Sequence, residues 1–216
     1  MSMQDKMTRV DAIMGMAPVI AVVVLDDASR AIGLARALVA GGIPVVEITL
    51  RTPAALDAVR AAAAEVPDAI VGVGTVRSGA DLDAALAAGA AFAVSPGAGP
   101  RLLDAAADHA LPLLPGAVTP TEVMALAERG YTRQKFFPAA AMGGPPVLKA
   151  FASPLPDVHF CPTGGVRVGT APDWLALPNV RCVGGSWVAP KEAIEARDWP
   201  RITALAAAAA RLGAPH

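Results

Sequence analysis

The sequence has little of what several common protein classes need. Two cysteines, Cys161 and Cys182, are too few for a disulfide scaffold, and we expect both to be reduced thiols inside strands. Lysine and arginine number 18 against 19 aspartate and glutamate residues, so no basic stripe indicates a nucleic-acid or membrane-surface partner. Charged residues, glycine and proline interrupt every apolar run before it reaches the ~20 residues of a membrane span. The first eleven residues lack the order of charged and apolar parts that a signal peptide has. We therefore expect a soluble cytoplasmic protein.

Histidine is also scarce, and the three that occur are far apart. We place His109 in a helix, His159 in a strand and His216 at the terminus. A catalytic zinc site needs ligands that cluster at the end of an element, so we expect no metal and interpret His159 as a hydrogen-bonded structural residue. No Ser-His-Asp arrangement is recognisable, and Gly-Gly-Ser-Trp does not fit a nucleophile elbow.

Lysine occurs only four times, and Lys135 differs from the others in its surroundings. It lies in Arg133-Gln134-Lys135-Phe136-Phe137-Pro138, an apolar run that predicts a strand ending at a proline. We expect solvent to hold the charges of Lys6, Lys149 and Lys191. Burial of an amine favours its neutral form, and a neutral lysine attacks carbonyl carbon. The pattern therefore indicates Schiff-base chemistry at Lys135.

With 216 residues, 54% of them hydrophobic, the chain suits one domain over residues 1–216. Apolar, β-branched runs predict strands at Val19–Leu25, Pro44–Leu50, Ala69–Thr75, Ala91–Ser95, Leu111–Leu114, Gln134–Phe137, Val158–Pro162 and Val180–Gly184. Alanine-rich amphipathic stretches predict helices at Gln4–Met14, Ala28–Ala40, Pro53–Glu65, Ala80–Ala88, Pro100–Asp108, Pro120–Glu128, Ala171–Leu177 and Pro200–Leu212. A Pro/Gly-rich stretch precedes Ala150.

About eight strand–helix units favour an α/β fold of the (β/α)8 TIM barrel type, with Gln4–Met14 as an extra N-terminal helix. An open doubly wound sheet is the alternative. No Gly-x-Gly-x-x-Gly follows the first strand, which argues against a dinucleotide-binding version of that fold.

Polar residues gather where the predicted strands end, which is where barrel enzymes carry their chemistry. Side chains alternate along a strand, so Glu47, Thr49 and Arg51 share one face. The other strand ends contribute Thr75, Ser95-Pro96-Gly97, Pro115-Gly116, Lys135 to Pro138, Thr163-Gly164-Gly165 and Gly184-Gly185-Ser186. Glycine pairs after the last two strands suit a phosphate site built from backbone N–H groups.

Each of these residues also has a purely structural interpretation. Glu47 would then be an ion-pair partner of Arg51 or Lys135, and Arg51 part of a salt bridge at the rim. Thr75 and Thr163 would bond backbone at strand ends, and the glycine pairs would form ordinary turns. Phe136, Phe137 and Phe160 are interpreted as core residues; if Lys135 faces inward, Phe137 does too and helps to keep water from the amine.

The motifs resemble those of the bacterial 2-keto-3-deoxy-6-phosphogluconate (KDPG) aldolases, which often also act on 4-hydroxy-2-oxoglutarate (KHG). The matching segments cover nearly the whole chain in the same order: Val46-Glu47-Ile48-Thr49-Leu50-Arg51-Thr52, Val71-Gly72-Val73-Gly74-Thr75-Val76, Ala93-Val94-Ser95-Pro96-Gly97, Leu114-Pro115-Gly116, Lys135-Phe136-Phe137-Pro138-Ala139, Phe160-Cys161-Pro162-Thr163-Gly164-Gly165 and Val183-Gly184-Gly185-Ser186-Trp187. One departure is Pro145-Pro146, which we expect to stiffen the loop after the strand of Lys135.

The resemblance implies a metal-free class I aldolase without a cofactor, assembled as a homotrimer. It implies that Lys135 forms the Schiff base and that Glu47 is the general acid/base. Arg51, Thr75, Pro96 and Thr163 would bind the pyruvate part of a small phosphorylated 2-keto acid, and Gly164, Gly165, Gly184, Gly185 and Ser186 its phosphate.

The implied reaction cleaves KDPG to pyruvate and glyceraldehyde 3-phosphate, and KHG to pyruvate and glyoxylate. An aldolase that prefers the C4 epimer, 2-keto-3-deoxy-6-phosphogalactonate, is an alternative. A phosphate-binding barrel isomerase would share the glycine pairs without needing a nucleophilic Lys135, and a non-catalytic sugar-phosphate-binding protein would use the same residues as contacts only.

Overall fold

The computed structural model describes residues 1–213, so His216 lies outside the described residues. All strand pairs in it are parallel and form two sheets, one of order β5-β4-β3-β2-β1-β9 and one of order β6-β7-β8. The strands are β1 Val19–Val23, β2 Val45–Thr49, β3 Ile70–Gly74, β4 Phe92–Val94, β5 Leu113–Leu114, β6 Gly116–Ala117, β7 Arg133–Phe136, β8 His159–Pro162 and β9 Val183–Gly185. The predicted α/β fold with a parallel sheet is confirmed.

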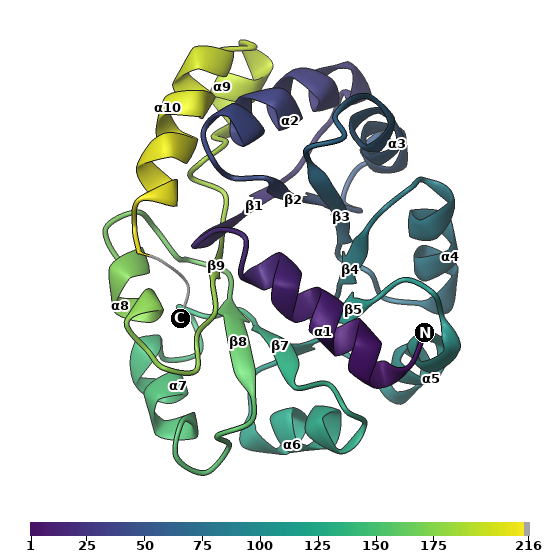
Figure 1. The fold of residues 1–216 in the computed structure, drawn as a ribbon, viewed down its shortest axis with the longest axis vertical. Helices are drawn as coiled ribbons and strands as arrows, with labels where there is room; N and C mark the ends of the chain where they lie inside the picture. The colour runs from purple at the N-terminus through teal and green to yellow at the C-terminus, as the bar shows by residue number, and fades with distance from the viewer. Residues whose placement is uncertain (214–216) are drawn as a thin grey trace.

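The two sheets curl toward each other at both of their junctions (Figure 1). At one junction a single residue, Pro115, separates β5 from β6, and its carbonyl accepts a hydrogen bond of 2.8 Å from the Lys135 N–H. At the other, bridges pair Phe160 with Val180 and Thr163 with Gly184, which brings β8 beside β9. The strands thus form a ring surrounded by helices.

The helices alternate with the strands and lie outside the ring (Figure 1). They are η1 Ala28–Arg30 (a 3₁₀ turn), α2 Ala31–Ala40, α3 Ala55–Glu65, α4 Gly79–Ala87, α5 Pro100–Asp108, α6 Pro120–Glu128, α7 Pro145–Phe151, α8 Ala171–Leu175, α9 Lys191–Glu195 and α10 Trp199–Ala210. Every predicted helix has a counterpart here, whereas α7 and α9 were not predicted. The expectation of a stiffened loop at Pro145-Pro146 was wrong, because both prolines occupy the first turn of α7, where a missing N–H costs nothing.

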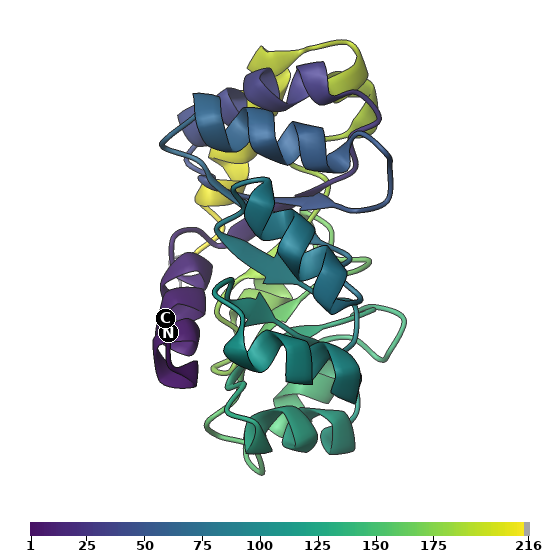
Figure 2. The same cartoon turned by 90° about the vertical axis from the view of Figure 1, so that its right-hand side faces the viewer.

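Helix α1 (Met3–Met14) lies across the amino-terminal ends of the strands, on one side of the ring (Figures 1 and 2). Its residue Lys6 is buried, 1% exposed, and its Nζ donates hydrogen bonds to the carbonyls of Ala106 (2.8 Å) and Ala107 (2.6 Å) at the end of α5. The expectation that solvent holds this charge was therefore wrong. The last carbonyls of a helix have no intrahelical donor and carry partial negative charge, so they can hold an ammonium.

A charged cluster joins α1 to the start of β7. Asp11 accepts hydrogen bonds from Arg133 and Arg181, and His159 lies beside them with no hydrogen-bond partner for its buried Nδ1 among residues 1–213. The ring has a backbone hydrogen bond with Asp157, so the interpretation of His159 as a hydrogen-bonded structural residue holds apart from Nδ1. Burial and the two arginine charges lower its pKa below 6.5, so His159 is kept neutral.

A glycine lets two neighbouring helices pack closely, and an aromatic cluster fills the space between other helices and the strands. A side chain at Gly41 would overlap Ala206, so α2 and α10 approach through bare backbone. Beneath α7 and α8, Phe136, Phe151 and Phe160 stack edge-on or tilted, with ring centroids 6.2–6.4 Å apart. Phe136 and Phe160 are core residues, as predicted.

Both cysteines are buried free thiols, although Cys182 lies one residue before β9 rather than inside it. His109 is likewise displaced from its expected helix: it caps the end of α5. Within residues 1–213, no helix is long and apolar enough to cross a membrane, and no group of three or more His, Cys, Asp or Glu side chains could hold a metal ion.

Candidate active site

Lys135 and Glu47 form a buried ion pair inside the ring of strands. Lys135 on β7 directs its Nζ to Oε1 of Glu47 on β2, at 3.2 Å, and the two side chains are 6% and 4% exposed. The two atoms are within hydrogen-bond distance, so a proton can pass between them along this contact. The ion pair between Glu47 and Lys135 that a purely structural role predicts therefore exists. The same contact is what proton transfer between the two groups requires.

The neighbouring strand makes room for the Glu47 carboxylate at a glycine. Gly74 ends β3, in register with Thr49 on β2, and a side chain at Gly74 would overlap the carboxyl group of Glu47. The second glycine of the Val-Gly-Val-Gly-Thr motif is therefore needed because its missing side chain leaves space for the Glu47 carboxylate, and not because it makes the chain flexible.

Arg51 and Thr75 meet just beyond the ends of β2 and β3. The Arg51 Nε lies 3.3 Å from the Thr75 hydroxyl, and Arg51 makes no ion pair within the described part of the chain. Thr75 has φ of 64°, in the left-handed region that β-branched residues rarely occupy. Such backbone costs of order 1–3 kcal/mol and is concentrated at functional sites. The guanidinium is exposed and unpaired, which leaves it able to grip a carboxylate.

A cavity of about 250 Å³, here called the active cavity, brings together six of the predicted site residues. Its lining is formed by Val22, Val24, Arg51, Phe137, Thr163, Gly164, Gly165, Val166, Gly184 and Ser186. Gly164 and Gly165 have φ of 96° and 78°, which only glycine adopts without strain, so the pair forms a turn that a substituted residue would distort. Gly185 belongs to β9 but does not line this cavity.

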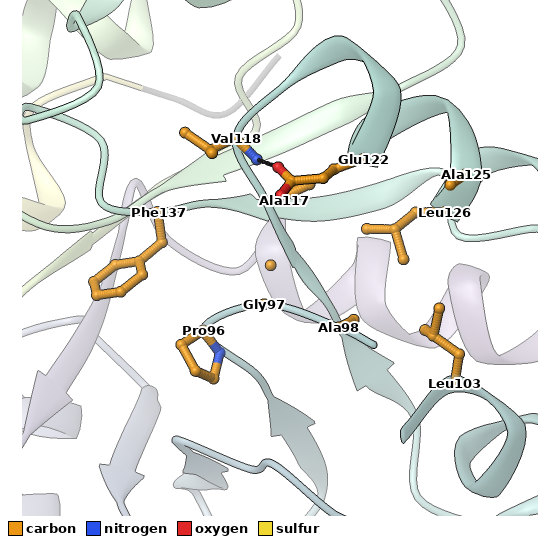
Figure 3. A pocket seen from close by; sticks show the side chains of 11 residues that line it. Pro96, Gly97, Ala98, Leu103, Ala117, Val118, Glu122, Ala125, Leu126 and Phe137 are labelled. Carbon is orange, nitrogen blue, oxygen red and sulfur yellow. Dashed lines mark hydrogen bonds between the residues drawn. The ribbon is translucent and has the colours of Figure 1, made fainter. Parts of the chain in front are cut away.

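Phe137 was predicted to be a core residue, and that prediction was wrong: its side chain forms part of the cavity wall. It separates the active cavity from a second cavity of about 170 Å³, in which it faces Pro96, Gly97 and Val118 (Figure 3). Its ring centroid lies 5.2 Å from the Lys135 Nζ, so it also covers the amine. Pro96, predicted to bind substrate, lines this second cavity and not the one that contains Arg51.

The assembled groups can perform carbonyl chemistry. A buried amine beside a carboxylate can form an imine and move protons, and an adjacent guanidinium can orient a 2-keto acid. The sequence indicated these groups, whereas Val22 and Val24 at the end of β1 carried no signal: an apolar strand end does not reveal which side chains face a cavity.

Comparison with known proteins identifies the family. A sequence model of the KDPG and KHG aldolases matches residues 10–205, most of the chain. The chain belongs to this family. Among aldolase relatives, the 2-dehydro-3-deoxy-phosphogluconate aldolase of Pseudoalteromonas atlantica is 53% identical over 88% of each chain, and the KHG/KDPG aldolase of Escherichia coli K12 is 48% identical over 94% of this chain and 96% of that one.

Solved aldolase structures have the same fold. The KDPG aldolase of Legionella pneumophila, with pyruvate captured as a covalent carbinolamine intermediate, has a TM-score of 0.91 at 46% identity and covers 93% of this chain and 97% of that chain.

Proposed function

We propose that the protein is a class I aldolase that cleaves KDPG to pyruvate and glyceraldehyde 3-phosphate, and KHG to pyruvate and glyoxylate. The observation that carries the proposal is the buried pair of Lys135 and Glu47, 3.2 Å apart, with the ring of Phe137 from the active-cavity wall 5.2 Å from the amine. A nucleophilic amine beside a proton-transferring carboxylate is what this reaction needs. Similarity to a 2-dehydro-3-deoxy-phosphogluconate aldolase and to a KHG/KDPG aldolase supports both substrates.

The reaction begins when neutral Lys135 adds through Nζ to the C2 ketone and forms a carbinolamine, which loses water to give an iminium. Glu47 removes the proton of the C4 hydroxyl, directly or through a water. The C3–C4 bond then breaks, its electrons pass into the iminium, and the aldehyde leaves. The remaining enamine takes a proton at C3, and hydrolysis of the imine releases pyruvate and restores the amine.

The other predicted residues bind and orient the substrate in this proposal. Arg51 holds the C1 carboxylate with a planar two-pronged contact, and Thr75 fixes the guanidinium through its hydroxyl. Thr163 lines the same cavity, and Pro96 closes the neighbouring wall behind Phe137. A carboxylate held at Arg51 would set the ketone against Lys135, and this would supply the proximity contribution to the rate.

The phosphate end is assigned to the loops after β8 and β9. Gly164, Gly165, Gly184 and Gly185 would offer backbone N–H groups, and Ser186 a hydroxyl. Gly165 and Ser186 line the active cavity from opposite loops, which supports a ligand held between them.

We also propose that the two sheets are one closed (β/α)8 barrel that forms a single domain, with β5 and β6 as one strand interrupted at Pro115. The bridges between β8 and β9 support closure. Assembly as a homotrimer in the cytoplasm rests on the family resemblance; sedimentation of the purified protein tests the trimer.

Borohydride reduction in the presence of pyruvate tests the mechanism. Peptide mass mapping should find a reduced pyruvate adduct on Lys135 alone, and Lys135→Ala should lose both the adduct and carbon–carbon cleavage while keeping its circular dichroism. Near-native turnover by Lys135→Ala, or activity lost to a chelator without any adduct, would refute the proposal.

A further inference from the structure

A third cavity adjoins the active cavity at its phosphate end. It has a volume of about 330 Å³ and lies between the end of β1 and the connection from β9 to α9. Val22, Val24 and Ser186 line both cavities. A substrate that extends from Arg51 to Ser186 therefore ends at the boundary of this third cavity, which we call the Lys191 cavity after its one basic residue.

The charges around this boundary are unevenly placed. Among the residues that line the active and Lys191 cavities, the basic ones are Arg51 and Lys191 and the acidic one is Asp26. In the proposed binding mode Arg51 holds the substrate carboxylate and Ser186 holds the phosphate. Arg51 therefore contacts the opposite end of the substrate from Ser186. Lys191 is thus the cation that the lining offers to a group bound at Ser186.

Lys191 is held loosely. Its Nζ lies 3.6 Å from Oδ2 of Asp26 and 3.7 Å from Oε1 of Glu195, both longer than hydrogen bonds, and its side chain is 72% exposed. Exposed ion pairs of this length contribute little, so the four-carbon stem can redirect the ammonium at small cost. Asp26 neutralises Lys191 while no anion is bound and opposes an anion once it arrives.

We propose that Lys191 is a specificity-determining residue that favours substrates with a phosphate at the end remote from the ketone. The inference rests on the proposed function and deepens it. Backbone N–H groups and the Ser186 hydroxyl are neutral donors that fix a phosphate in place, whereas a mobile ammonium adds the positive charge that a dianion attracts. KHG ends in a carboxylate at C5, whereas the phosphate of KDPG is carried on C6, so Lys191 should act on the longer substrate and distinguish the two.

The test compares Lys191→Met with Lys149→Met, which removes the same charge from exposed α7 and lines neither cavity. The ratio of KM for KDPG to KM for KHG should rise about three- to tenfold in Lys191→Met and stay constant in Lys149→Met. The difference should shrink in 0.5 M salt, which screens an exposed charge. Asp26→Asn should lower the ratio. An unchanged ratio in Lys191→Met, or an equal rise in both KM values, would overturn the inference.

Binding of glycerol 3-phosphate, measured by calorimetry, is a readout that needs no turnover. Lys191→Met should weaken it by a similar factor, and Lys149→Met should not. If the wild-type protein released pyruvate from neither substrate, the proposed function would be wrong, and calorimetry would still decide whether Lys191 binds the phosphate. Equal affinities in the two variants would reject Lys191 even in an active enzyme.

Discussion

Replacing Glu47 by glutamine tests the site through both stability and rate. Removal of one partner of a buried ion pair costs about 3–5 kcal/mol, because the other charge is left without compensation. The pair here is 3.2 Å apart with side chains 6% and 4% exposed, so solvent screens it little. Glutamine keeps an oxygen that can accept a hydrogen bond from Lys135, which reduces the expected loss to roughly 2–4 kcal/mol.

The same change should lower kcat by about 10²–10⁴, because an amide cannot exchange protons with the substrate. Urea unfolding measures the free energy of unfolding, and a lactate dehydrogenase-coupled assay of pyruvate release measures the rate. Glu128→Gln is the control: Glu128 is exposed at the end of α6, and its loss should change stability by less than about 0.5 kcal/mol and leave the rate unchanged.

A double-mutant cycle isolates the pair itself. Lys135→Met removes the cation, so the combination of Lys135→Met with Glu47→Gln should destabilise less than the sum of the two single changes, by about 1 kcal/mol or more. Additive losses would mean that the two groups are not paired in solution. A Glu47→Gln protein as stable as the Glu128→Gln control and within about threefold of its rate would refute the reasoning altogether.

Three further changes give expected outcomes elsewhere in the molecule. Lys6→Met should cost about 2–3 kcal/mol in urea unfolding, since it leaves two helix-terminal carbonyls without a donor, whereas Lys149→Met should cost under about 0.5; equal stabilities would contradict the buried contact. Burial and two arginine charges lower the pKa of His159, so just below pH 6.5 the unfolded chain binds more protons than the folded one and the free energy of unfolding decreases as the pH falls. His159→Gln should flatten that decrease between pH 6.5 and 5.5, and identical slopes in the two proteins would contradict it. Ser186→Ala should raise KM for KDPG more than for KHG, and equal effects would exclude Ser186 from the phosphate site.

Much of the fold could be predicted because its local signals agree. Buried parallel strands appear as apolar runs and their helices as alanine-rich repeats, so each predicted strand overlaps an observed one. Helix α7 was missed because Pro145 and Pro146 suggest a loop, and only the first turn of a helix tolerates them. Pro115 interrupts the strand between β5 and β6. Whether a proline breaks a strand depends on its position in the folded sheet, and the local sequence does not predict that position.

The sequence by itself determined which groups are available for chemistry: one lysine in an apolar strand, one acid within a strand, and glycine pairs where the last strands end. Alternation along a strand also predicts one face for Glu47 and Thr49, because side-chain direction in a strand is a local property, whereas Arg51 lies two residues beyond the end of β2. Only the tertiary structure decided that the Lys135 amine meets Glu47 at 3.2 Å and that Lys6 is buried at the end of α5. Those contacts join segments 88 to 101 residues apart, and distance along the chain carries no record of which strand ends a closed sheet brings together.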